Sequence, residues 1–104
     1  MFIQIFTTVA RKSEAEKIAK ILLDKKIAAC VQISSSVTSL FFWENKIEKS
    51  KEYVVGIKTG KNLYKEVEKV IQENHSYELP EIISIEISGG SKKYFDWMKN
   101  ALKK

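Results

Sequence analysis

A long run of extended sequence occupies the middle of this chain. Residues 28–33 are small or β-branched, and the serines at 34–36 lead into a second extended run at 37–43. The polar residues 44–46 supply turn chemistry, and residues 52–59 provide the returning strand. The connection is short enough for two neighbouring antiparallel strands. The sequence therefore predicts an extended β-ribbon arm.

Two shorter strand patterns lie outside this ribbon. Residues 2–8 alternate in the manner of a strand and are apolar on both faces. Residues 83–87 alternate isoleucine with polar side chains, which is the clearest half-buried strand pattern in the chain. We expect the isoleucines of this last strand to face a core.

Three segments carry the spacing of amphipathic helices. The first is predicted for residues 13–25, where Ser13 and Glu16 form a capping box and Glu14 faces water. The second is predicted for residues 62–74, and the third follows the glycines at 89 and 90. The apolar stripe expected for the third helix consists of Tyr94, Trp97, Met98 and Ala101.

The order of these elements is strand, helix, strand, strand, helix, strand, helix, within a single domain of residues 1–104. This order predicts an α+β fold of the ferredoxin-like βαββαβ type, with an extra C-terminal helix. Two helices are expected to cover one face of a four-stranded antiparallel sheet, with right-handed crossovers. The two helices leave the other face of the sheet uncovered, so something else must cover it.

Four large apolar side chains gather on the arm, at Leu40, Phe41, Phe42 and Trp43. A chain of 104 residues has a modest core, and one copy has little with which to cover them. Burying each is worth about 1.5–3 kcal/mol, so docking several against another copy rivals the stability of the domain itself. We therefore predict an obligate homo-oligomer.

Charge and composition argue against several classes of protein. The net charge is +5, but Arg11 is the one arginine among 18 basic residues, and the lysines lie beside acidic residues on helical faces. This pattern favours a solvated surface over nucleic-acid binding.

No apolar run approaches the roughly 20 residues that span a bilayer, and the start lacks signal-peptide character. With Cys30 as the one cysteine, no internal disulfide can form, so we expect a cytoplasmic protein without membrane contact.

A constrained turn separates the second helix from the last strand. It gathers the one histidine and the one proline of the chain, with a tyrosine and two carboxylates, in His75-Ser76-Tyr77-Glu78-Leu79-Pro80-Glu81. Proline fixes its own φ and pushes the preceding residue toward extended geometry. The turn is therefore presented on rigid backbone, and we expect any functional site to include it.

Four ordered landmarks make the chain resemble the CutA family of divalent-cation tolerance proteins along nearly its whole length. They are residues 28–33, the aromatic run 41–43 before 44–47, the strand end 57–59 and the turn 75–83. The resemblance implies a ferredoxin-like subunit in a tight homotrimer, similar in architecture to PII signalling proteins. It also implies a role in tolerance of copper and other divalent cations, with no obligatory cofactor and no catalytic reaction. Ser76 departs from the family pattern, which usually has proline there.

Candidate metal ligands come from the residue types that zinc and copper prefer. One chain offers Cys30 and His75, with Glu78 as a nearby carboxylate. These residues make a weak metal site within one chain. The site becomes stronger if a subunit boundary brings the ligands of several copies together. Two alternatives stay open: Cys30 as a small buried strand residue, and His75 as a helix C-terminal residue that interacts with the helix dipole.

A ligand pocket is expected to draw on Trp43, Lys58, Tyr77 and Arg11. Lys58 ends an apolar strand and could meet an anion or pair with Glu78, and Arg11 precedes a helix N-terminus that favours anions. Trp43 could instead anchor an interface. The alternative function is thus a PII-like trimer that binds a small anion or metabolite at interfacial clefts. A less favoured alternative is an acylphosphatase-like hydrolase using Arg11, although the glycines of its phosphate loop are absent.

Overall fold

The structure is a computed structural model and describes residues 1–103. Its elements follow one another in the order predicted from the sequence. They are β1 (Phe2–Val9), α1 (Lys12–Asp24), β2 (Cys30–Trp43), β3 (Lys46–Gly60), a short 3-10 helix η1 (Lys61–Leu63), α2 (Tyr64–Asn74), β4 (Ile83–Ile87) and α3 (Lys92–Ala101).

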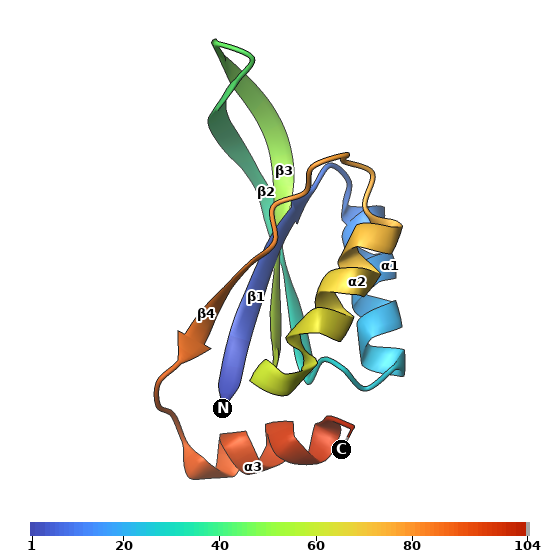
Figure 1. Cartoon of the computed structure of the whole chain (residues 1–104), viewed down its shortest axis with the longest axis vertical. Helices are drawn as coiled ribbons and strands as arrows, with labels where there is room; N and C mark the ends of the chain where they lie inside the picture. Colours follow the sequence, from blue (N-terminus) through green and yellow to red (C-terminus); the bar gives the residue numbers. More distant parts are fainter. Residues whose placement is uncertain (104) are drawn as a thin grey trace.

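The four strands form one antiparallel sheet in the order β2-β3-β1-β4. Helices α1 and α2 lie together on one face of this sheet, and α3 runs across its lower end near the N-terminus (Figure 1). The predicted ferredoxin-like α+β fold with an extra C-terminal helix is therefore confirmed. Across residues 1–103, no helix has the length and apolar character needed to cross a membrane.

The core lies between the two helices and the central strands. One face of β1 is buried along its whole length, at Ile3, Ile5, Thr7 and Val9, because its side chains alternate between the helices and the open face. The buried stripes of the helices meet this face, with Ile18 and Leu22 from α1 and Val67 and Ile71 from α2 fully enclosed.

The start of α1 differs from the prediction. The helix begins at Lys12 with Arg11 as its N-cap and without a side-chain cap, so the expected capping box of Ser13 and Glu16 does not form. Glu14, predicted to face water, is only 8% exposed. Its carboxylate instead accepts hydrogen bonds from Ser76, a contact across 62 residues that local sequence patterns do not reveal.

The last strand and the last helix are less buried than predicted. Ile83 and Ile85 of β4 are 51% and 57% exposed, because they share the sheet face that α1 and α2 do not cover. On α3, Met98 is buried as predicted, whereas Tyr94 and Trp97 remain largely exposed. A single chain therefore leaves apolar side chains uncovered on its open face.

The predicted arm is confirmed. Beyond the sheet, β2 and β3 continue as a two-stranded ribbon that stands clear of the rest of the molecule (Figure 1). The strands reverse at Glu44 and Asn45, whose positive φ angles of 48° and 65° suit the tight hairpin turn between them. Trp43 pairs with Lys46 next to this turn, which fixes the register of the whole ribbon.

A buried hydroxyl in the core gives a first testable prediction. Thr7 is fully buried, and its Oγ1 has no hydrogen-bond partner among residues 1–103. Replacing Thr7 by valine keeps the shape and removes the unsatisfied group, so we expect the free energy of unfolding to rise by about 1 kcal/mol. Urea denaturation at fixed protein concentration measures this change.

Thr59 provides the matched control. It is equally buried, but its Oγ1 donates a hydrogen bond to the Ile27 carbonyl oxygen over 2.6 Å. Thr59→Val should therefore lower the free energy of unfolding by about 1–2 kcal/mol, because the carbonyl loses its donor. A destabilised Thr7→Val variant would contradict the prediction.

Candidate functional site

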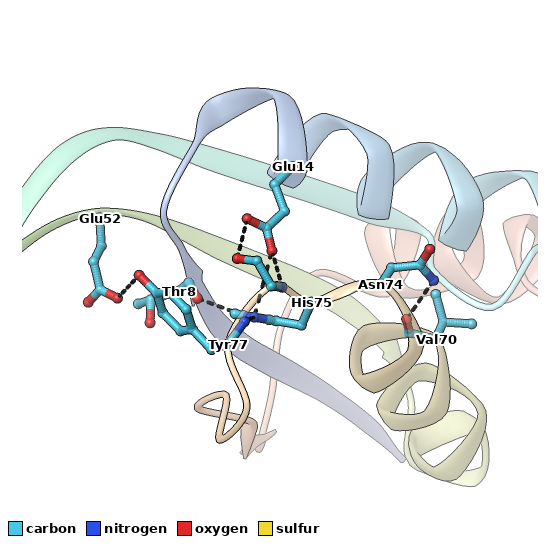
Figure 2. A network of polar contacts seen from close by, with 8 residues as sticks. Thr8, Glu14, Glu52, Val70, Asn74, His75 and Tyr77 are labelled. Carbon is cyan, nitrogen blue, oxygen red and sulfur yellow. Dashed lines mark hydrogen bonds and ion pairs between the residues drawn. The ribbon is translucent and has the colours of Figure 1, made fainter.

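The turn after α2 is fixed by the buried side chain of His75 (Figure 2). His75 Nε2 lies 2.8 Å from the Thr8 carbonyl oxygen, and Nδ1 lies 3.0 Å from the backbone nitrogen of Tyr77. A carbonyl oxygen only accepts, so Nε2 carries the proton and donates, while Nδ1 accepts from the Tyr77 N–H. Both ring nitrogens of a neutral imidazole are thus used within the chain, and they tie the turn to the end of β1.

Glu14 of α1 holds the same turn from the other side. Its carboxylate accepts one hydrogen bond from the Ser76 backbone N–H over 2.8 Å and another from the Ser76 hydroxyl over 3.0 Å. One of its oxygens also lies 3.6 Å from His75 Nδ1. Proline offers neither donor, so Ser76 replaces the stiffness of a proline with two hydrogen bonds to α1.

Tyr77 connects the turn to the base of the ribbon. Its hydroxyl donates a hydrogen bond to Glu52 Oε2 on β3 over 2.8 Å (Figure 2). Burial raises the pKa of the Tyr77 hydroxyl above its ordinary value, and the hydrogen bond and negative charge of Glu52 raise this pKa further. Tyr77 is therefore a neutral donor at physiological pH, and Glu52 is its acceptor.

The turn and the ribbon border an open hollow of about 370 Å³, which we call the acidic hollow. On β2 and β3, Phe41 lies opposite Glu48 in the register, so both side chains project from the same face of the ribbon. None of the described residues that line the hollow is a lysine or an arginine. The lining consists of Phe41, Trp43, Glu48, Ser50, Glu52, Tyr77, Glu78 and Leu79.

The opposite face of the ribbon has a different character. Side chains alternate between the two faces of a strand, so Leu40 and Phe42 project away from the acidic hollow. Leu40 pairs with Lys49, and Phe42 pairs with Ile47. We call this surface the lysine face, and its members are Thr38, Leu40, Phe42, Ile47, Lys49 and Lys51.

Two of the predicted site residues lie at the other end of the sheet. Cys30 is half-buried opposite Lys58, and Lys58 is in turn opposite Gln4 on β1. His75 contacts Thr8, four residues further along β1, which corresponds to about 13 Å of strand. Lys58 Nζ lies 3.4 Å from the Tyr94 hydroxyl and 5.4 Å from the centre of its ring, so Lys58 is not paired with Glu78.

Arg11 lies in a separate hollow at the start of α1. It is exposed, and it shares this hollow with Lys17 and with the carboxylates of Glu14 and Glu73, so the hollow carries charges of both signs. Of the four residues predicted to form a ligand pocket, the structure therefore brings together Trp43 and Tyr77. It places Lys58 and Arg11 elsewhere.

The predicted metal ligands are not assembled within one chain. Among residues 1–103, no three His, Cys, Asp or Glu side chains converge in a way that could hold a metal ion. Cys30 lies at the far end of the sheet, His75 uses both nitrogens, and Glu78 is exposed at the acidic hollow. A metal site built from these residues requires more than one copy.

Sequence reasoning missed Glu48 and Glu52, which supply most of the charge of the acidic hollow. A signal was present: a two-residue turn at Glu44 and Asn45 places Phe41 opposite Glu48 and sets the side chains of each ribbon face. The role of Glu14 had no such signal, because its partner lies in the distant turn.

Comparisons with known proteins confirm the family resemblance. The family profile described as CutA1 divalent ion tolerance protein matches residues 3–101. The divalent-cation tolerance protein CutA of Archaeoglobus fulgidus is 43% identical over 94 residues, which cover 90% of this chain and 91% of that protein. The chloroplastic protein CutA of Arabidopsis thaliana is 35% identical over 95% of this chain, and the match spans 54% of its length. The chain thus spans about half the length of such plant relatives.

Solved structures of CutA proteins are also similar to this chain in fold and sequence. The structure of the periplasmic divalent cation tolerance protein CutA from Archaeoglobus fulgidus matches with a TM-score of 0.95 and 40% identity, covering 99% of this chain and 100% of that one. The divalent cation tolerance protein of Thermus thermophilus matches with a TM-score of 0.96 and 28% identity over 99% of this chain and 100% of that one. With matching sequence and fold, this chain belongs to the CutA1 divalent ion tolerance protein family.

Proposed function

We propose that this protein acts in tolerance of divalent cations as a non-catalytic homotrimer that binds such cations at the boundaries between its subunits. The relatives named above are divalent-cation tolerance proteins, which supports the general role. The observation that carries the assembly is the uncovered lysine face of the ribbon. We also propose a cytoplasmic location, which cell fractionation tests, since relatives include proteins named as chloroplastic and periplasmic.

The exposure of the ribbon supports the assembly. Phe42 and Ile47 are 70% and 73% exposed, and they lie side by side with the exposed Leu40 on the lysine face. An apolar surface of this kind marks an interaction site in a soluble protein. Because Ile83 and Ile85 are also uncovered on the open face of the sheet, a second copy has two apolar surfaces on which to pack.

The cation-binding part of the proposal concerns Glu78. Among residues 1–103 it makes no ion pair, and it is exposed at the rim of the acidic hollow. A divalent cation there needs further ligands, which a neighbouring copy would supply. Cys30 remains a proposed ligand from such a copy, and His75 can ligate after one of its present hydrogen bonds is broken.

Calorimetric titration of the purified protein with copper and zinc ions tests this part. We expect saturable binding that Glu78→Gln weakens at least about tenfold, because a charged ligand becomes neutral without a change in shape. Glu16→Gln, an exposed carboxylate on α1, is the matched control and should bind as the wild type does. The absence of saturable binding of either ion would remove the cation-binding proposal.

The anion-binding alternative has less support. Lys58 lies opposite Gln4, whereas Arg11 follows the end of β1, so the two proposed anion contacts lie at opposite ends of the strand. The hollow around Arg11 contains two carboxylates as well as Lys17, so it is not a purely cationic site for an acyl phosphate. A rise in melting temperature with added nucleotide, and none with metal ions, would favour this alternative instead.

A further inference from the structure

A buried carboxylate without a cationic partner lies in the wall of the acidic hollow. Glu52 is only 7% exposed, and its hydrogen bond comes from the neutral hydroxyl of Tyr77. Among residues 1–103, no lysine, arginine or histidine forms an ion pair with it. Buried charges in proteins are normally paired, so this position favours a positive group from outside the chain.

The other residues that line the acidic hollow indicate the chemistry of this positive group. Three aromatic side chains, Phe41, Trp43 and Tyr77, line it beside Leu79. Aromatic faces attract cations through their quadrupole, and they do so best where the cation carries little bound water. Two further carboxylates, Glu48 and Glu78, add negative charge to a hollow without basic residues, in a chain whose net charge is +5.

A small metal ion does not suit this arrangement within one chain. Divalent metal ions need several oxygen, nitrogen or sulfur ligands that converge at short distances, and no such group of three occurs among residues 1–103. The hollow measures about 370 Å³, which lies within the usual range of small-molecule sites. Its charges are spread along an apolar wall, which fits a cation that carries alkyl groups.

We propose that the acidic hollow binds a small organic ammonium ion, with its alkyl groups against Phe41 and Trp43 and its charge facing Glu48 and Glu52. The site goes beyond the divalent-cation role proposed above and does not depend on it. The hollow and the lysine face lie on opposite sides of the ribbon, so a copy that packs on the lysine face alone does not cover the hollow.

Tryptophan fluorescence tests the proposal on the assembled protein in the presence of EDTA. A Trp97→Phe background leaves Trp43 as the one tryptophan, and therefore as a reporter within the hollow. Choline chloride is the probe, and 3,3-dimethylbutan-1-ol is its neutral counterpart of the same shape. We expect choline to change the fluorescence saturably at constant ionic strength, and the alcohol to bind at least about tenfold more weakly.

Two isosteric variants show whether the carboxylates of the hollow matter. Glu48→Gln should weaken choline binding at least about fivefold, because one charge that faces the ammonium is lost. Glu44→Gln changes a carboxylate at the ribbon turn, outside the hollow, and should leave binding unchanged. Circular dichroism and light scattering verify that both variants fold and assemble like the wild type.

Three results would overturn the proposal. They are no effect of choline beyond that of sodium chloride, equal binding of choline and the alcohol, and equal weakening by Glu48→Gln and Glu44→Gln. The first result would also be obtained if a lysine of a neighbouring copy fills the hollow. Because the metal is chelated here and Glu78 is left unchanged, failure of choline binding does not alter the outcome of the copper and zinc titration.

Discussion

Replacing Phe42 and Ile47 together by serine is expected to convert the assembled protein into single chains at micromolar concentration. These residues are 70% and 73% exposed in one chain and form a cross-strand pair on the lysine face. Losing both removes roughly 3–6 kcal/mol from each contact between copies, which corresponds to about 10²–10⁴-fold weaker association. Multi-angle light scattering over a dilution series measures the change.

Leu23→Ser is the matched control for this experiment. Leu23 is also an exposed apolar residue, but it lies on α1 and not on the ribbon, so its loss should leave the mass unchanged. A wild-type protein that is monomeric at micromolar concentration would contradict the proposed trimer. An assembled double variant would show instead that other surfaces, such as the exposed face of β4, hold the copies together.

Replacing His75 by alanine is expected to lower the free energy of unfolding by about 2–4 kcal/mol. The imidazole is fully buried, and its removal leaves the Thr8 carbonyl oxygen without a donor and the Tyr77 N–H without an acceptor. Urea denaturation measures this loss, with all variants at the same protomer concentration because the proposed assembly would contribute to stability.

Two variants and a chelator separate this structural role from metal binding. His75→Gln keeps one donor and one acceptor and should recover part of the stability, while Glu73→Ala on the exposed end of α2 should change it by less than about 0.5 kcal/mol. If His75 mainly holds a metal ion, EDTA should destabilise the wild type as much as the alanine substitution does. We expect EDTA to leave the wild type unchanged.

The sequence was sufficient for the fold because each element carries a local signal. The periodicities of the helices and strands, the polar turn at residues 44–46 and the small-residue run before the arm all depend on neighbours in the sequence. Their order then leaves few topologies, since connections are short and crossovers are right-handed. The arm and its exposed aromatic residues were identified in the same way.

The site was only partly predictable, because its contacts join distant segments. The turn at 75–81 and the participation of Trp43 and Tyr77 could be anticipated, but the burial of Glu14 depends on Ser76. The exposure of Ile83 has a similar cause, since the alternation of β4 identifies an apolar face without showing what covers it. Likewise, residue type alone could not reveal that Cys30 and His75 lie at opposite ends of the sheet.

The hydrogen bonds of the turn also have a consequence for folding kinetics. The bond from His75 to Thr8 spans 67 residues, and the bonds from Ser76 to Glu14 span 62. Closing such long loops lowers the conformational entropy of the chain before the contact can compensate for that loss. We therefore expect these contacts to form late on the folding pathway. A weakened turn should therefore accelerate unfolding more than it slows refolding, which shortens the lifetime of the folded chain.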